Sequence, residues 1–196
     1  DNEASSNLWN KPVVLRIEYG WGQMSENQIP LDRIPEIYDW DFTVSLDGAK
    51  IAELQPCWQS APLAEDRRHS ITKKSTAGFT LQSYTSRQRC LFNRDTHSMA
   101  LRIQGSPGSI LSINVRKPEE KRITLKLSDL LKGDEAYRIN RNSLKIHRII
   151  PELRSKTAFT ITDDSPGDSV DWYYIRVAQK NGQLAWSSPI WVEKRV

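Results

Sequence analysis

Four carboxylates gather in one short segment near the end of the chain. Asp163, Asp164, Asp168 and Asp171 lie within "DDSPGDSVD", among glycine, proline and serine residues that favour a loop. Carboxylate oxygens are hard ligands of the kind that Ca²⁺ prefers, although the spacing is not that of an EF-hand. The sequence therefore leaves two interpretations open, a calcium site and a solvated acidic loop.

The three histidines, His69, His97 and His147, are isolated from one another in the sequence. A catalytic metal centre needs several His, Asp or Glu side chains that converge on the ion, often at short spacings. Asp66 precedes His69 and Asp95 precedes His97, but such spacings are common by chance. The GxSxG motif of a serine nucleophile is absent as well. We therefore expect no catalytic residue and no catalytic metal within this chain.

Seven tryptophans are many for 196 residues. Exposed aromatic rings can stack on sugars or form a partner interface. Trp21 stands between two glycines in an expected loop, and Trp58 and Trp172 complete a candidate ligand-binding set. The alternative for most of these rings is burial in a sandwich core or at a domain interface.

Short runs of alternating apolar residues are the elements that would position these groups. In "PVVLRIEYG", Val13 begins the apolar side of a strand that continues to Tyr19. "WDFTVSLDGAKIAELQP" predicts a hairpin with its turn at Asp47-Gly48. A last hairpin is expected over 172–179 and 183–192, with a bulge near Pro189. Further strands are predicted in "AGFTLQSYT", "HSMALRIQGSPGSILSINV", "KRITLKL", "SLKIHRII" and "TAFTITD".

The spacing of these strands predicts an all-β fold, an immunoglobulin-like antiparallel β-sandwich. Helix signals are confined to "LSDLLKGDE", so we expect at most one short helix. One elongated domain over 1–196 is the first expectation. Two stacked β subdomains, 1–117 and 118–196, are the alternative, divided at the charged segment around Pro118.

The net charge of +4 hides an uneven distribution. Residues 1–66 carry 4 Lys and Arg against 12 Asp and Glu, whereas residues 67–156 carry 20 against 7. The basic residues alternate along strands, as on a solvated sheet face, so nucleic-acid binding is not expected. No apolar run is long enough for a membrane span. Cys57 and Cys90 could form a disulfide or remain two separate thiols.

The closing segment "DWYYIRVAQKNGQLAWSSPIWV" resembles the C-terminal segment of secreted bacterial proteins that carry a PHP-type (polymerase and histidinol phosphatase-like) metallohydrolase domain. "DWDFTVSLDGAKIAELQP", "EDRRH" and "AGFTLQSYTSR" look like earlier parts of the same pattern, so the resemblance extends loosely from Trp40 to Val192. It implies a β-rich region that follows a catalytic domain. It carries over no metal ligand, because the His-rich motifs have no counterpart here.

We therefore expect a non-catalytic accessory module of an extracytoplasmic (periplasmic or secreted) bacterial protein, which packs against or targets a hydrolase domain in the same or another chain. The polar start "DNEASSNLWN" suits a processed N-terminus or a fragment. The main alternative is a carbohydrate-binding module that uses Trp21, Trp58 and Trp172. A third is an enzyme that is active only within an assembly. No cofactor is expected apart from the calcium alternative.

Overall fold

The computed structural model of the chain describes residues 8–21, 37–58, 69–86, 96–152, 158–163, 170–178 and 184–193. It contains two compact units, Asp1–Thr157 and Ala158–Val196. This division differs from both expected arrangements. Pro118 is not a boundary, because it lies in the turn between two strands that pair with each other, β7 (Ile110–Lys117) and β8 (Lys121–Lys126).

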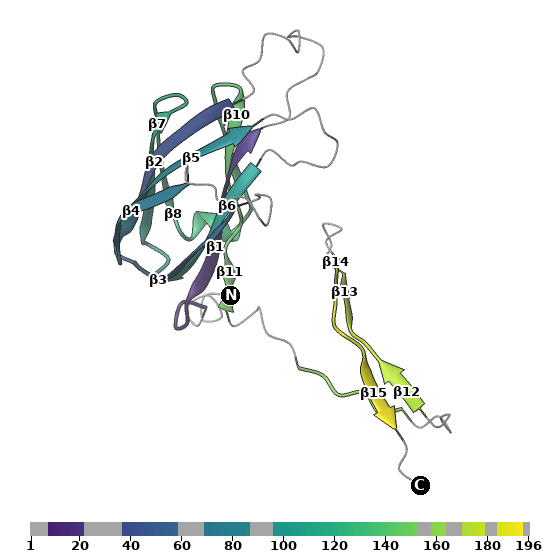
Figure 1. Cartoon of the computed structure of the whole chain (residues 1–196). Coiled ribbons are helices and arrows are strands. Elements are labelled where there is room, and N and C mark those ends of the chain that lie inside the picture. The colour runs from purple at the N-terminus through teal and green to yellow at the C-terminus, as the bar shows by residue number, and fades with distance from the viewer. Residues whose placement is uncertain are drawn as a thin grey trace. The chain divides into compact units, whose positions relative to one another are not determined.

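The first unit is a sandwich of two antiparallel sheets (Figure 1). One sheet has the order β3 (Lys50–Cys57), β6 (Thr96–Gln104), β1 (Val13–Trp21), β10 (Asn142–Ile146) and β9 (Glu135–Ile139), with β11 (Ile150–Pro151) paired to the start of β1. The other has the order β4 (Ser70–Ser75), β5 (Gly78–Ser86), β2 (Ile37–Asp47), β7 and β8. The predicted all-β antiparallel sandwich is confirmed.

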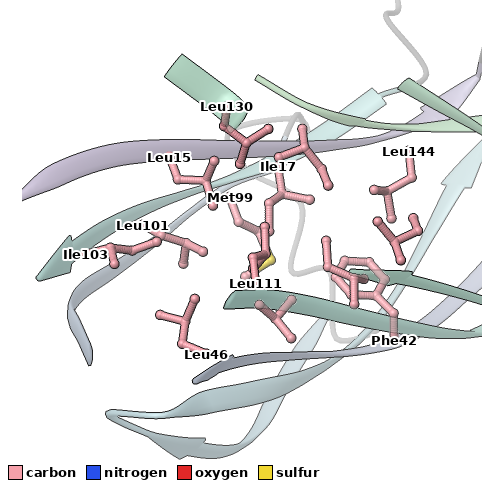
Figure 2. Close-up of a cluster of buried hydrophobic side chains, with 14 of the residues drawn as sticks. Leu15, Ile17, Phe42, Leu46, Met99, Leu101, Ile103, Leu111, Leu130 and Leu144 are labelled. Atoms are coloured by element: carbon pink, nitrogen blue, oxygen red, sulfur yellow. The ribbon is translucent and has the colours of Figure 1, made fainter. Parts of the chain in front are cut away.

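Alternation of apolar and polar residues gives each sheet one face that must be covered. In β1, Val13 through Tyr19 are buried at every second position, while Arg16 between them is exposed. Figure 2 shows side chains of the two sheets meeting between them: Leu15, Ile17, Met99, Leu101, Ile103 and Leu144 from the first sheet, and Phe42, Leu46 and Leu111 from the second. This shared core holds the two sheets together.

The predicted hairpin at Asp47-Gly48 is wrong. β2 and β3 flank this turn, and Gly48 has the positive φ of 70° that a turn glycine favours, yet the two strands belong to opposite sheets. The backbone N–H of Leu46 donates to Ala77 and that of Ile51 to Thr76, so both strand ends bond to the β4–β5 turn. The chain crosses between sheets here because Leu46 and Ile51 both have to face the core from opposite sides.

The 3₁₀ turn Asp129–Leu131 is the helical element that lies wholly within the described residues. Ser128 stands at its N-cap position without a side-chain capping bond, and Leu130 is buried in the core. This fits the expectation of at most one short helix. Within the part of the chain that the structure describes, no helix is long and apolar enough to span a membrane.

The second unit contains an antiparallel hairpin whose arms are each divided in two. β12 (Val170–Tyr173) pairs with β15 (Ile190–Glu193), and β13 (Arg176–Ala178) pairs with β14 (Leu184–Trp186). The register changes by one residue between the two pairs, beside Ser187 and Pro189. The predicted bulge is therefore confirmed. The expected strand "TAFTITD" is wrong, because residues 158–163 are not in a strand.

Gly78, the first residue of β5, tests how closely the strands of the second sheet approach. A Cβ added to Gly78 would lie 2.2 Å from the carbonyl oxygen of Val44, a backbone atom that cannot turn aside. We expect Gly78→Ala to lower the free energy of unfolding by at least about 2 kcal/mol, measured by urea denaturation. Gly108→Ala is the matched control, because nothing lies within 4 Å of its added Cβ. Equal stability of the two variants would contradict this packing.

Candidate functional site

The structure separates the three tryptophans that the sequence groups as ligand-binding candidates. Trp21 is the last residue of β1, paired with Asn142, and not part of a loop; its side chain lies outside the described residues. Trp58 is half-buried beside His69 in the first unit. Trp172 is exposed on the hairpin of the second unit.

The acidic segment is described only in part, since Asp164 and Asp168 lie outside the described residues. Asp163 accepts a hydrogen bond from the Tyr173 hydroxyl at 2.9 Å. Asp171 lies on β12, opposite Val192. Among the described residues, no group of three or more His, Cys, Asp or Glu side chains is placed to hold a metal. The calcium site remains a prediction.

A cluster of buried and half-buried aromatic and polar side chains lies where β1 ends and β6 begins. We call it the histidine cluster; it comprises Tyr19, Trp58, His69, Ser83, Tyr84 and His97. The His69 ring stacks between Trp58 at 4.7 Å and Tyr84 at 5.0 Å, measured between ring centroids. His97 meets the same ring edge-on at 4.7 Å. Both histidines are isolated in the sequence, yet they are neighbours in space.

Ser83 joins the two sheets at the histidine cluster. Its hydroxyl oxygen lies 2.8 Å from the Tyr19 hydroxyl, which donates to it, and 2.7 Å from His69 Nδ1. Burial raises the pKa of Tyr19 to about 12, and the hydrogen bond with Ser83 opposes this rise. A raised pKa keeps the Tyr19 hydroxyl protonated at neutral pH, so it serves as a hydrogen-bond donor.

The contact between His69 and Ser83 has the length of a nucleophile–base pair. Ser83 is only 5% exposed, however, and its hydroxyl is held by Tyr19 between the two sheets. A nucleophile has to face its substrate, so this geometry suits structural hydrogen bonding better than catalysis. One feature of the sequence indicated a buried hydroxyl here. Ser83 follows Leu81 by two residues in β5, so it takes an inward position. A polar group there needs a partner.

The outer face of the second sheet has a shallow depression of about 260 Å³ near the same strands. It is lined by Asp39, Trp40, Asp41, Gln82, Ser83, Tyr84 and Lys117. Asp41 already forms an ion pair with Arg116, and Trp40 and Ser83 present almost no surface. The volume is below that of an ordinary small-molecule site.

A charged network covers part of the outer face of the first sheet. Glu18 contacts Arg16 at 2.8 Å and His147 Nε2 at 3.3 Å, and Asp134 contacts Lys145 at 2.8 Å. The hydrogen bond from His147 lowers the pKa of Glu18, with the charges of Arg16 and Lys145 acting in the same direction. The hydrogen bond from Lys145 lowers the pKa of Asp134.

Cys57 lies at the end of β3 as a free, exposed thiol, and its sulfur contacts the carbonyl oxygen of Gln55 at 3.8 Å. Cys90, the other half of the disulfide alternative, lies outside the described residues.

The C-terminal hairpin exposes large apolar side chains along its described length. They are Val170, Trp172, Tyr173, Tyr174, Ile175, Val177, Leu184, Trp186, Ile190, Trp191 and Val192. Trp172 is 55%, Trp186 59% and Trp191 64% exposed, so the alternative of a core position does not hold for these three rings. By contrast, the exposed large apolar side chains among the described residues of the sandwich are Ile37 and Ile150.

Three aromatic rings gather on one face of the hairpin. Trp172 stacks on Tyr174, with 5.5 Å between ring centroids and 10° between the planes, and lies 6.3 Å from Trp191. Cross-strand pairing places Trp172 directly opposite Trp191. An exposed aromatic surface of this kind is suited to bind another molecule.

The fold and these surfaces define a β-sandwich protein with an apolar C-terminal hairpin. No family model matches the chain, and no solved structure matches it. An uncharacterized protein of Chlamydia muridarum and one of Chlamydia trachomatis serovar D are each 50% identical to it over 34 residues. The matched segment is 17% of this chain and 6% of each relative, so the similarity covers a small part of these longer proteins and of the chain itself.

The hydrogen bond between Tyr19 and Ser83 can be measured by a double-mutant cycle. We expect Ser83→Ala to lower the free energy of unfolding by about 1–3 kcal/mol and Tyr19→Phe by about 1 kcal/mol. The double variant should lose less than the sum, because both single changes remove the same bond. Ser112→Ala, on the outer face of β7, is the control and should change the free energy by less than about 0.5 kcal/mol. Strict additivity would show that this bond does not stabilise the sandwich.

The lowered pKa of Glu18 predicts a loss of stability in acid. A carboxylate whose pKa is lower in the folded state stabilises the fold above its unfolded pKa of about 4.5, and this contribution disappears as the pH falls through the folded value. We expect Glu18→Gln to remove this part of the pH dependence, worth less than about 1 kcal/mol, in denaturation series from pH 7 to pH 2. Glu120→Gln, an exposed carboxylate in the β7–β8 turn, should leave the profile unchanged. Identical profiles for wild type and Glu18→Gln would contradict the prediction.

Proposed function

We propose that this chain is a non-catalytic accessory module that attaches to a hydrolase domain through its C-terminal hairpin. The observation that carries the proposal is the exposure of large apolar side chains along the hairpin. Soluble monomers rarely expose contiguous apolar patches larger than a few hundred Å², and larger patches mark interaction sites.

The distribution of polar side chains supports an attachment role for the hairpin. The outer face of the sandwich carries ion pairs such as Arg102–Glu152 at 2.7 Å and Lys145–Asp134 at 2.8 Å. The pair in the sandwich with the length of a nucleophile–base contact, Ser83 and His69, is buried, and its two members are bonded to each other. Catalysis therefore belongs, in this proposal, to the domain to which the hairpin attaches.

The nature of the partner rests on the resemblance of residues 171–192 to the end of proteins with a PHP-type metallohydrolase domain. The proposed partner is such a domain, in the same or another polypeptide, in an extracytoplasmic compartment of a bacterium. The chain supplies the β-rich region and the partner supplies the metal ligands.

A direct binding measurement tests this proposal. A purified PHP-type metallohydrolase domain encoded in the same genome should bind the full chain in isothermal titration calorimetry. We expect the Trp172→Ser, Trp191→Ser double variant to weaken binding at least about 30-fold, because buried tryptophans dominate interface energies. Ile37→Ser, which removes an exposed apolar side chain of the sandwich, is the matched control and should change the affinity less than about twofold. Absence of binding by the wild-type chain would overturn the choice of partner, and hydrolysis of a phosphodiester by the purified chain alone would overturn the non-catalytic role.

Carbohydrate binding is a second candidate function, favoured by the stacked Trp172, Tyr174 and Trp191 rings. Flat exposed rings offer apolar faces on which sugar rings can pack. This candidate predicts that the chain binds at least one sugar on a glycan array and that Trp172→Ala abolishes the signal. An array without signal would exclude it.

A further inference from the structure

The hairpin is apolar on both of its faces. Side chains alternate between the two faces of a strand, and residues directly opposite each other in a pair share a face. One face therefore carries Trp172 and Trp191, with Trp186 opposite Arg176 beyond the bulge. The other face carries Tyr173 opposite Ile190, followed by Val177 opposite Ala185, and its one charged residue in the two strand pairs is Asp171, opposite Val192 at the end of the hairpin. Both sets of large apolar side chains are exposed.

A strand pair of this composition differs from the usual surface hairpin. An antiparallel sheet with one solvated face shows polar residues on that face, and strands that are apolar on both faces are those covered on both sides. A two-stranded hairpin that packs against nothing is at best marginally stable in water. The hairpin conformation therefore needs a cover on both sides.

The size of one face limits what could cover it. Two strands about 5 Å apart with roughly nine residues at about 3.3 Å each span about 10 Å by 30 Å, or roughly 300 Å². A stable protein–protein interface buries about 800 Å² on each partner. Contact through one face, as when two copies stack their tryptophans, falls well short. Contact through both faces and the ends comes close to the required area.

We propose that the hairpin folds as it inserts between two apolar layers of the partner domain, which cover its two faces at once; this inference rests on the attachment role proposed above. Arg176 defines a further property of the partner. It shares a face with Trp172 and Trp186 and would lose its hydration on insertion. A buried charge requires a paired opposite charge, so the layer over the tryptophan face carries a carboxylate that meets Arg176.

Hydrogen–deuterium exchange on the full chain alone tests the inference without any partner. Residues 170–178 and 184–193 should exchange at rates close to those of an unfolded peptide, while β1, β2 and β6 in the sandwich are strongly protected. Analytical ultracentrifugation of the same sample should show a monomer. Protection of the hairpin in the monomer would overturn the inference, because the hairpin would then need no outside cover. Protection that appears only with a dimer would also overturn it and identify a second copy as the occupant.

Face-specific variants test the two-sided cover with the metallohydrolase domain as the probe. Trp172→Ser with Trp186→Ser alters one face, and Ile175→Ser with Val177→Ser alters the other. We expect each double variant to weaken binding at least about 30-fold, with Ile37→Ser again as the control. If only one face matters, the two-sided insertion is wrong and the attachment role stands. If the wild-type chain does not bind this domain, the proposed partner is wrong, and the exchange measurement alone decides whether the hairpin depends on a cover.

Discussion

The described structure depends on one constraint, the need to bury apolar side chains away from water. Each sheet of the sandwich has one apolar face, and burying it against the other sheet stabilises the fold by about 25 cal/mol for each Å² removed from water. The crossing of the chain at Gly48 follows from this constraint, since Leu46 and Ile51 reach the core from opposite sheets. The paired hydroxyls at Tyr19 and Ser83 follow as well, because a polar group in this core has to find a partner inside it.

The sequence predicted which residues of a strand face inward, and it did not predict which sheet the strand joins. The apolar positions of Val13–Tyr19 are buried as their alternation indicates. Alternation has the same period in both sheets, however, so it cannot distinguish a hairpin from a crossing between layers. Asp47-Gly48 favours a tight turn in either case. The outcome was decided by long-range bonds, such as the one from Ile51 to Thr76, which no local pattern contains.

The candidate sites show the same limit more sharply. His69 lies 14 residues from Ser83, and Tyr19 lies 64 residues from it, so their meeting depends on the pairing of strands from both sheets. The inward position of Ser83 was the only local sign of a buried polar partner. In the hairpin, alternation correctly sorted Trp172 from Tyr173 onto opposite faces, but composition could not show whether either face is covered, because core strands and docking strands have the same apolar residues.

The two units differ in which side chains they expose. The sandwich holds the His69 imidazole and the Ser83 and Tyr19 hydroxyls inside, where their hydrogen bonds join the two sheets and a substrate would have to displace them. The hairpin offers little reactive chemistry and a large apolar surface. Binding needs an exposed surface such as that of the hairpin. Catalysis would need reactive groups such as those inside the sandwich, but in an exposed position. The tryptophans that make this segment distinctive in the sequence are among its exposed apolar side chains, and a two-stranded hairpin that packs against nothing is at best marginally stable in water.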